Sequence, residues 1–167
     1  MEWCTPADLL AAESDTDLIA ELAAPTDQPP VSGALLRLAV AGGAIGGEQE
    51  EAAAGALARL VRACAEGGDQ VDAHLASRWP GGLSPVPAIV RSAAVGLALE
   101  DLLGARTAAP DGPYSGIIRR AKTARATLVA LRDGTLTLGT ASVSTPATVR
   151  YQAADRLLTA DTLAGMG

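Results

Sequence analysis

Residues 70–104 read QVDAHLASRWPGGLSPVPAIVRSAAVGLALEDLLG, and the fold depends on this stretch. Val71, Leu75 and Trp79 recur at intervals of four, a spacing that places side chains on one face of a helix. Pro80 and the two glycines that follow it end this helix, because proline lacks an amide hydrogen and glycine favours non-helical angles. The stretch therefore predicts one helix, a tight connection and a second helix running back along the first.

The second helix of this hairpin is predicted to begin near Ser84-Pro85. Serine is a good N-cap, and proline is favoured at the first helical position. Pro87 leaves the first helical residue open, because it pushes Val86 away from helical angles. Few of the following residues are charged, so this helix is expected to lie in the core, with the predicted core residues Ile89, Val90, Ala93, Ala94, Leu97, Leu99 and Leu102.

Helical patterns also occur on both sides of the hairpin. Thr5 is expected to cap the first helix, and Gly134 is expected to end the last one. Gly67 and Gly68 interrupt the longest pattern, at a cost of about 1 kcal/mol per glycine relative to alanine, so either a continuous but weakened helix or a kink is expected there. The predicted helices are one opened by residues 5–8 and those at 18–23, 48–79 and 114–132, while 31–41 stays ambiguous.

The chain changes character after residue 134. Thr135 to Leu138 alternates between polar and apolar residues, which predicts one short strand. Residues 139–148 are rich in Ser and Thr and are expected to form a mobile loop, and residues 155–163 are apolar enough to dock on a partner. We therefore predict a mainly α protein: an antiparallel helical bundle at 1–134, and a minor β element with an extended C-terminal tail at 135–167.

The composition limits the kind of core this chain can build. Hydrophobic residues make up 49% of the 167 residues, but aromatic residues only 2%, and there is no Phe. A core of Ala, Leu, Val and Ile buries less area per residue, so modest stability and some reliance on partners are expected. The formal net charge of −6 argues against a protein that coats nucleic acid. The charge does not exclude an acidic surface that DNA passes without binding.

The sequence offers little for catalysis, for metal binding or for a membrane. His74 is the single histidine, and Cys4 and Cys64 form no C-x-x-C pair, so free thiols in a reducing compartment are expected. The glycine-rich stretch at 42–47 lacks the Lys-Ser/Thr pair of a phosphate-binding loop. No leader pattern and no apolar run of about 18 residues is present. We expect no enzymatic activity, no cofactor and no metal, and a protein made in the cytoplasm without membrane contact.

Charged side chains on the helices are the candidate interaction residues. Asp72 and Arg78 are either solvated charges or groups that tether the hairpin or join subunits. The basic stripe of the last helix is either a solvated face, a contact with another copy or a partner protein, or a surface that touches nucleic-acid phosphate. Its residues are Arg119, Arg120, Lys122 and Arg125. The acidic patch expected to meet it comprises Asp15, Asp17, Glu48, Glu50 and Glu51.

Three segments resemble, in order, the motifs of the Mu-type phage family of head–tail joining proteins. The opening WCTPADLL at 3–10 is similar to an aromatic-x-T-P-x-D-L-hydrophobic start. The hairpin resembles V-D-x-x-L-A-x-R-aromatic followed by a valine–proline pair, which here is VDAHLASRW at 71–79 and Val86-Pro87. The sequence DRLLTADTL at 155–163 is similar to a D-R-x-hydrophobic-T-x-D-x-L close. Together the three segments span nearly the whole chain.

The resemblance implies a structural connector, or adaptor, in the neck of a virion. Such a protein docks as a ring, implied to be dodecameric, on the portal protein of a filled capsid. DNA passes through the ring without sequence recognition, and a tail or stopper protein attaches to it. The closing segment is then the expected docking element, through Arg156, Leu157, Leu158 and Leu163. The alternative is a cytoplasmic helical regulatory or binding module that uses Val86 to Leu103 as its partner groove.

Overall fold

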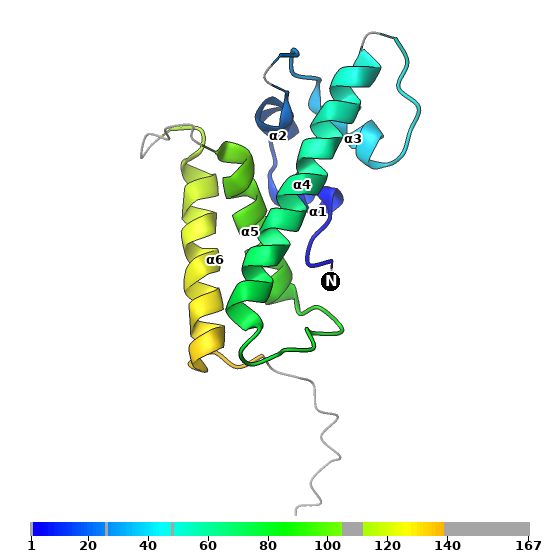
Figure 1. Ribbon diagram of the computed structural model, residues 1–167. Helices are drawn as coiled ribbons and strands as arrows, with labels where there is room; N and C mark the ends of the chain where they lie inside the picture. Colours follow the sequence, from blue (N-terminus) through cyan, green and yellow to red (C-terminus); the bar gives the residue numbers. More distant parts are fainter. Residues whose placement is uncertain (1, 26, 48, 105–111, 139–167) are drawn as a thin grey trace, which may run out of the picture.

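The structure, a computed structural model, describes residues 2–25, 27–47, 49–104 and 112–138. Within these residues the mainly α prediction and the antiparallel bundle are confirmed (Figure 1). The helices are α1 Pro6–Ala12, α2 Thr16–Ala23, α3 Gly33–Val40, α4 Gln49–Leu75, α5 Ala88–Leu103 and α6 Ser115–Asp133. Helices α4, α5 and α6 run up and down beside one another, and α1 to α3 gather around the N-terminal half of α4.

Helix α5 is the centre of the bundle because it packs along both α4 and α6. Its residues from Ala93 to Leu99 are all buried, as expected for a helix with partners on two sides. Small residues let the three backbones approach closely. A methyl group on Gly67 of α4 would lie 2.8 Å from the carbonyl oxygen of Ala94, and one on Gly96 would lie 3.1 Å from the Cβ of Ala124 on α6.

Gly67 and Gly68 do not kink the longest helix. Helix α4 is continuous from Gln49 to Leu75, so the continuous helix is the one of the two predicted alternatives that is found. Both glycines are buried, Gly67 against α5 and Gly68 against the indole of Trp3. The cost of two glycines in a helix is therefore offset by packing that larger residues would prevent.

Local capping fixes the short helices. Thr5 and Asp8 form a reciprocal capping box at the start of α1, with Pro6 at the first helical position, as predicted. Asp15 caps α2 by accepting hydrogen bonds from two backbone amides. The carboxylate of Asp17 accepts a 2.6 Å hydrogen bond from the amide of Gly33, which ties α2 to the start of α3. These contacts define the starts of α1 and α2 and tie α2 to α3.

The core prediction for α5 is correct for Leu97 and wrong for Ile89. Leu97 is 1% exposed, whereas Ile89 is 42% exposed. Helix α5 begins at Ala88, after Pro87, rather than near Ser84-Pro85. Ile89 therefore lies in the first turn of α5 on its exposed side, whereas the adjacent Val90 is buried.

The predicted strand at 135–138 is wrong, and no strand occurs in the part of the chain that the structure describes. Gly134 ends α6 in the left-handed conformation, as predicted, with φ of 80°. The chain then folds back on the helix, because the amide of Leu136 and the hydroxyl of Thr135 both donate to the carbonyl of Ala130. The predicted mobile loop at 139–148 and the docking tail, with Arg156, Leu157, Leu158 and Leu163, lie outside the described residues.

Candidate interaction surface

Arg78 holds the end of α4 against the end of α6. Its guanidinium donates a 2.6 Å hydrogen bond to the carbonyl oxygen of Leu131, in the last turn of α6. A cation at this position also interacts favourably with the negative end of the helix dipole. The side chain lies over the ring of Trp79 as well, 5.0 Å from its centroid. Arg78 therefore ties the turn after α4 to the end of α6 within one chain, through a backbone carbonyl rather than through Asp72.

Two of the four basic residues of α6 have partners inside the monomer. Arg125 and Glu100 of α5 form an ion pair of 2.6 Å, with a second hydrogen bond of 2.8 Å between the same side chains. Arg120 donates a 2.7 Å hydrogen bond to the carbonyl of Ala12 and lies 3.4 Å from the carboxylate of Glu13. These two arginines fasten α6 to α5 and to the end of α1. Of the predicted stripe, Arg125 is exposed as expected but already paired with Glu100, whereas Arg120 is only half-exposed and bound to the end of α1.

Arg119 and Lys122 are the two basic residues of this stripe that have no partner within the described residues. Both side chains are exposed, and neither forms an ion pair or side-chain hydrogen bond within the described residues. They are three residues apart, so they lie on neighbouring parts of one helix surface. We call this pair the basic edge.

An acidic groove lies between the N-terminal segment and α4. It has a volume of about 430 Å³, and its lining includes the carboxylates Glu2, Asp69 and Asp72, with no basic side chain. Its remaining walls are formed mainly by apolar and small residues, among them Trp3, Cys4, Pro6, Val61, Cys64, Ala65 and Gly68. Asp72, a predicted interaction residue, therefore lies in a groove of one charge sign.

This acidic groove differs from the acidic patch that the sequence suggested. Asp15 and Asp17 are engaged in capping α2 and in holding α3, so their carboxylates have roles within the chain. Glu50 and Glu51 are exposed at the start of α4, and Glu48 lies outside the described residues. The groove escaped sequence reasoning because Glu2 and Asp69 are 67 positions apart and meet only in the fold. The one available signal was the spacing of Asp69 and Asp72, three apart on one helix.

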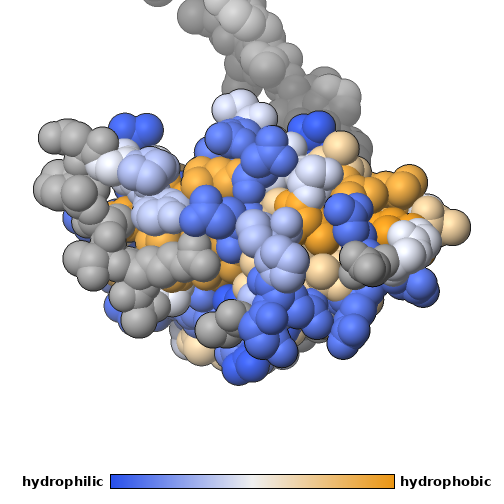
Figure 2. Space-filling model, turned by 90° about the horizontal axis from the view of Figure 1, so that it is seen from above, coloured by the Kyte–Doolittle hydropathy of each residue, from blue (hydrophilic) through white to orange (hydrophobic). Residues whose placement is uncertain are grey.

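Some large apolar side chains remain at the surface. Val61 is 53% exposed at the acidic groove, and Leu38 on α3 is 41% exposed. Seen from the end that carries α2 and α3, apolar residues gather on the α3 side among hydrophilic ones (Figure 2). The middle of α5, proposed as the partner groove of the regulatory alternative, is buried against α4 and α6. Nearer its start, Ala88, Arg91, Ser92 and Val95 line a hollow of about 430 Å³ together with α1 and Arg120.

Within the described ranges, no group of three or more His, Cys, Asp or Glu side chains is arranged to hold a metal ion. In the same ranges no helix is both long and apolar enough to cross a membrane. His74 is half-buried near the end of α4. The chemically distinctive features of the described surface are thus the basic edge and the acidic groove.

The described residues thus form an all-helical bundle with an acidic groove beside α4 and a pair of exposed, unpaired cations on α6. Residues 3–155 match the family described as Bacteriophage Mu, Gp36, and the chain belongs to that family. The match begins at Trp3, includes the whole hairpin and reaches only the first residue of the closing motif at 155–163. The chain is therefore a Mu-type phage protein. No match was found among curated proteins.

Proposed function

We propose that this chain is a structural connector that joins the head of a phage particle to its tail. Copies assemble as a ring on the portal protein, DNA passes through the ring, and a tail or stopper protein binds its far side. Membership in a Mu-type phage family supports a role in a phage particle, and the charge distribution supports a contact between copies. The proposal assigns the protein no catalytic step and no cofactor.

The proposed contact places the basic edge of one copy against the acidic groove of the next. Arg119 and Lys122 provide two positive charges, and the groove provides three carboxylates. Helix α6 lies at one side of the bundle, and the N-terminal segment lies across α4 from it (Figure 1). A contact between two different faces is heterologous, and repeating it generates a ring when the rotation closes. The opposite charges of the basic edge and the acidic groove are the observation that carries the proposal.

The expected strength of this contact explains why a portal is part of the proposal. An exposed ion pair contributes about 0.2–1 kcal/mol, so two such pairs do not hold two copies together at low concentration. Covering Val61 adds apolar burial at about 25 cal/mol per Å². We therefore expect free copies to be monomeric and rings to form on the portal or at high concentration.

The other proposed partners follow from parts of the chain with different chemistry. Arg156, Leu157, Leu158 and Leu163, which lie outside the described residues, are proposed to dock on the portal or on the tail-side protein. A net charge of −6 disfavours tight binding to DNA, which suits passage without sequence recognition. The competing position for the basic edge is the channel, where Arg119 and Lys122 would touch DNA phosphate.

Sedimentation velocity with and without the portal protein tests the proposal. Arg119→Glu combined with Lys122→Glu is expected to abolish ring formation in the absence of DNA, and raised salt is expected to weaken the wild-type ring. Arg37→Glu, in an exposed part of α3, is the matched control and leaves assembly intact. If the double variant forms rings like the wild type and alters only DNA retention, the basic edge faces the channel and the subunit contact is refuted.

A further inference from the structure

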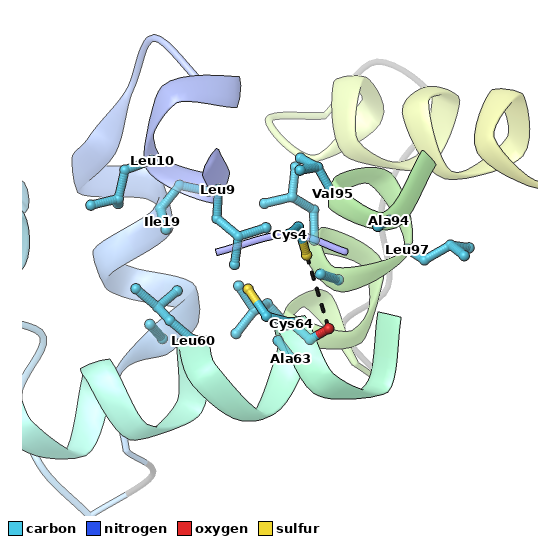
Figure 3. Packing of buried hydrophobic residues seen from close by; sticks show 14 of the residues in the cluster. Cys4, Leu9, Leu10, Ile19, Leu60, Ala63, Cys64, Ala94, Val95 and Leu97 are labelled. Carbon is cyan, nitrogen blue, oxygen red and sulfur yellow. Dashed lines mark hydrogen bonds between the residues drawn. The ribbon is translucent and has the colours of Figure 1, made fainter. Parts of the chain in front are cut away.

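The two cysteines meet in the fold although 60 positions separate them. Cys4 lies in the segment before α1, and Cys64 lies in the middle of α4. The sulfur of Cys4 is 3.9 Å from the carbonyl oxygen of Cys64, to which its thiol donates, and both thiols are free (Figure 3). The surrounding side chains, which include Leu9, Leu60 and Val95, are apolar and buried.

The two neighbouring thiols also affect each other's ionisation. The Cys64 side chain lowers the pKa of Cys4, whereas the Cys4 side chain, together with burial, raises the pKa of Cys64. A thiolate is the attacking species in thiol–disulfide exchange, so Cys4 is the sulfur that reacts first. Both residues line the acidic groove, which gives a reagent a path from solvent to otherwise buried sulfurs.

We propose that Cys4 and Cys64 are a thiol–disulfide redox pair, in which a small disulfide oxidant links the N-terminal segment covalently to the middle of α4. The thiolate of Cys4 attacks one sulfur of the oxidant, its S–S bond breaks, and one thiolate leaves. Cys64 gives up its proton and attacks the Cys4 sulfur of the mixed disulfide, releasing the second thiolate. The pair loses two electrons, the oxidant gains them, and the two protons go to the released thiols.

The link has a defined structural consequence. It joins the two walls of the acidic groove, because Cys4 belongs to the N-terminal wall and Cys64 to the α4 wall. It also closes a loop of about 60 residues, which restricts the unfolded chain far more than the folded one. Oxidation is therefore expected to raise the melting temperature by the order of 10 °C. This consequence concerns a single copy and does not depend on the proposed assembly.

The test uses the full-length protein, incubated at pH about 8 with oxidised glutathione or with a reducing agent. The expected result is the loss of both free thiols, an intact mass lower by two hydrogens, a cross-linked peptide pair containing Cys4 and Cys64, and a reversible rise in melting temperature. In Cys64→Ser, Cys4 is expected to retain glutathione as a stable mixed disulfide. Three results would overturn the proposal: a retained glutathione adduct on the wild type, a disulfide between two copies, or thiols that oxidise only after unfolding in urea.

Discussion

Replacing Gly67 by alanine separates helix propensity from packing, because the two effects have opposite signs. In an isolated helix this change is expected to stabilise by about 1 kcal/mol. In the folded chain the added methyl group would lie 2.8 Å from the oxygen of Ala94, 3.0 Å from the amide nitrogen of Ala98 and 3.1 Å from its Cβ. Ordinary van der Waals contact begins at 3.4 Å, and two of these atoms are backbone.

The α4–α5 contact must therefore widen to accept the methyl group. Overpacking of this kind costs about 1–3 kcal/mol, and the propensity gain offsets part of that cost. Because the atoms at 2.8 and 3.0 Å belong to the backbone and cannot move aside easily, we expect an overpacking cost of about 2–3 kcal/mol. Subtracting the propensity gain of about 1 kcal/mol leaves the free energy of unfolding of Gly67→Ala lower by about 1–2 kcal/mol. At about 2–4 °C per kcal/mol for a chain of this length, the melting temperature should fall by several degrees.

The assay is urea unfolding followed by circular dichroism at 222 nm, a wavelength that reports helix content, together with a thermal melt. Gly116→Ala in the first turn of α6 is the matched control, because a methyl group there meets no atom within 4 Å. It is expected to leave stability unchanged or to raise it by up to about 1 kcal/mol. A Gly67→Ala variant as stable as the wild type, or more stable, would refute the close α4–α5 approach.

Three further predictions concern helix packing and helix ends. Leu97→Ala should cost about 2–5 kcal/mol, whereas Ile89→Ala, at an exposed site, should change the unfolding free energy by less than about 0.5 kcal/mol; equal effects in urea titrations would contradict the burial described above. Arg78→Ala should cost about 1 kcal/mol through the lost bond to the end of α6, and an unchanged midpoint would show that this bond is negligible. Thr5→Ala should cost about 0.5–2 kcal/mol by removing the capping box, and faster amide exchange in α1 would report it; unchanged exchange would count against the cap.

Much of the fold could be predicted from local sequence signals. Apolar spacing located α4, α5 and α6, and the Thr5 and Gly134 end signals were correct because capping depends on neighbouring residues alone. The start of α5 was misplaced because Ser and Pro also occur in turns. The strand at 135–138 was wrong because an alternating pattern forms a strand only beside a partner, and here the segment bonds back to α6.

The candidate site was predictable only in part, because charge pairing is decided by tertiary contacts. The sequence indicated that four cations lie close together on α6, but it could not indicate that Glu100 neutralises Arg125 or that Arg120 reaches the end of α1. The acidic groove and the contact between the two cysteines join residues about 60 positions apart or more, so neither has a local signature. Gly67 shows the same limit, since its packing role depends on the helix that crosses it.

A charge exchange between the two proposed contact surfaces tests the central claim most directly. One variant carries Arg119→Glu and Lys122→Glu, a second carries Asp69→Lys and Asp72→Lys, and a third carries all four changes. The mass of assemblies formed on the portal protein is measured for each. The account predicts that the first two variants fail to form rings and that the third regains them, because the reversed surfaces attract again. A four-fold variant that assembles no better than the first two, or a first variant that forms normal rings, would contradict it.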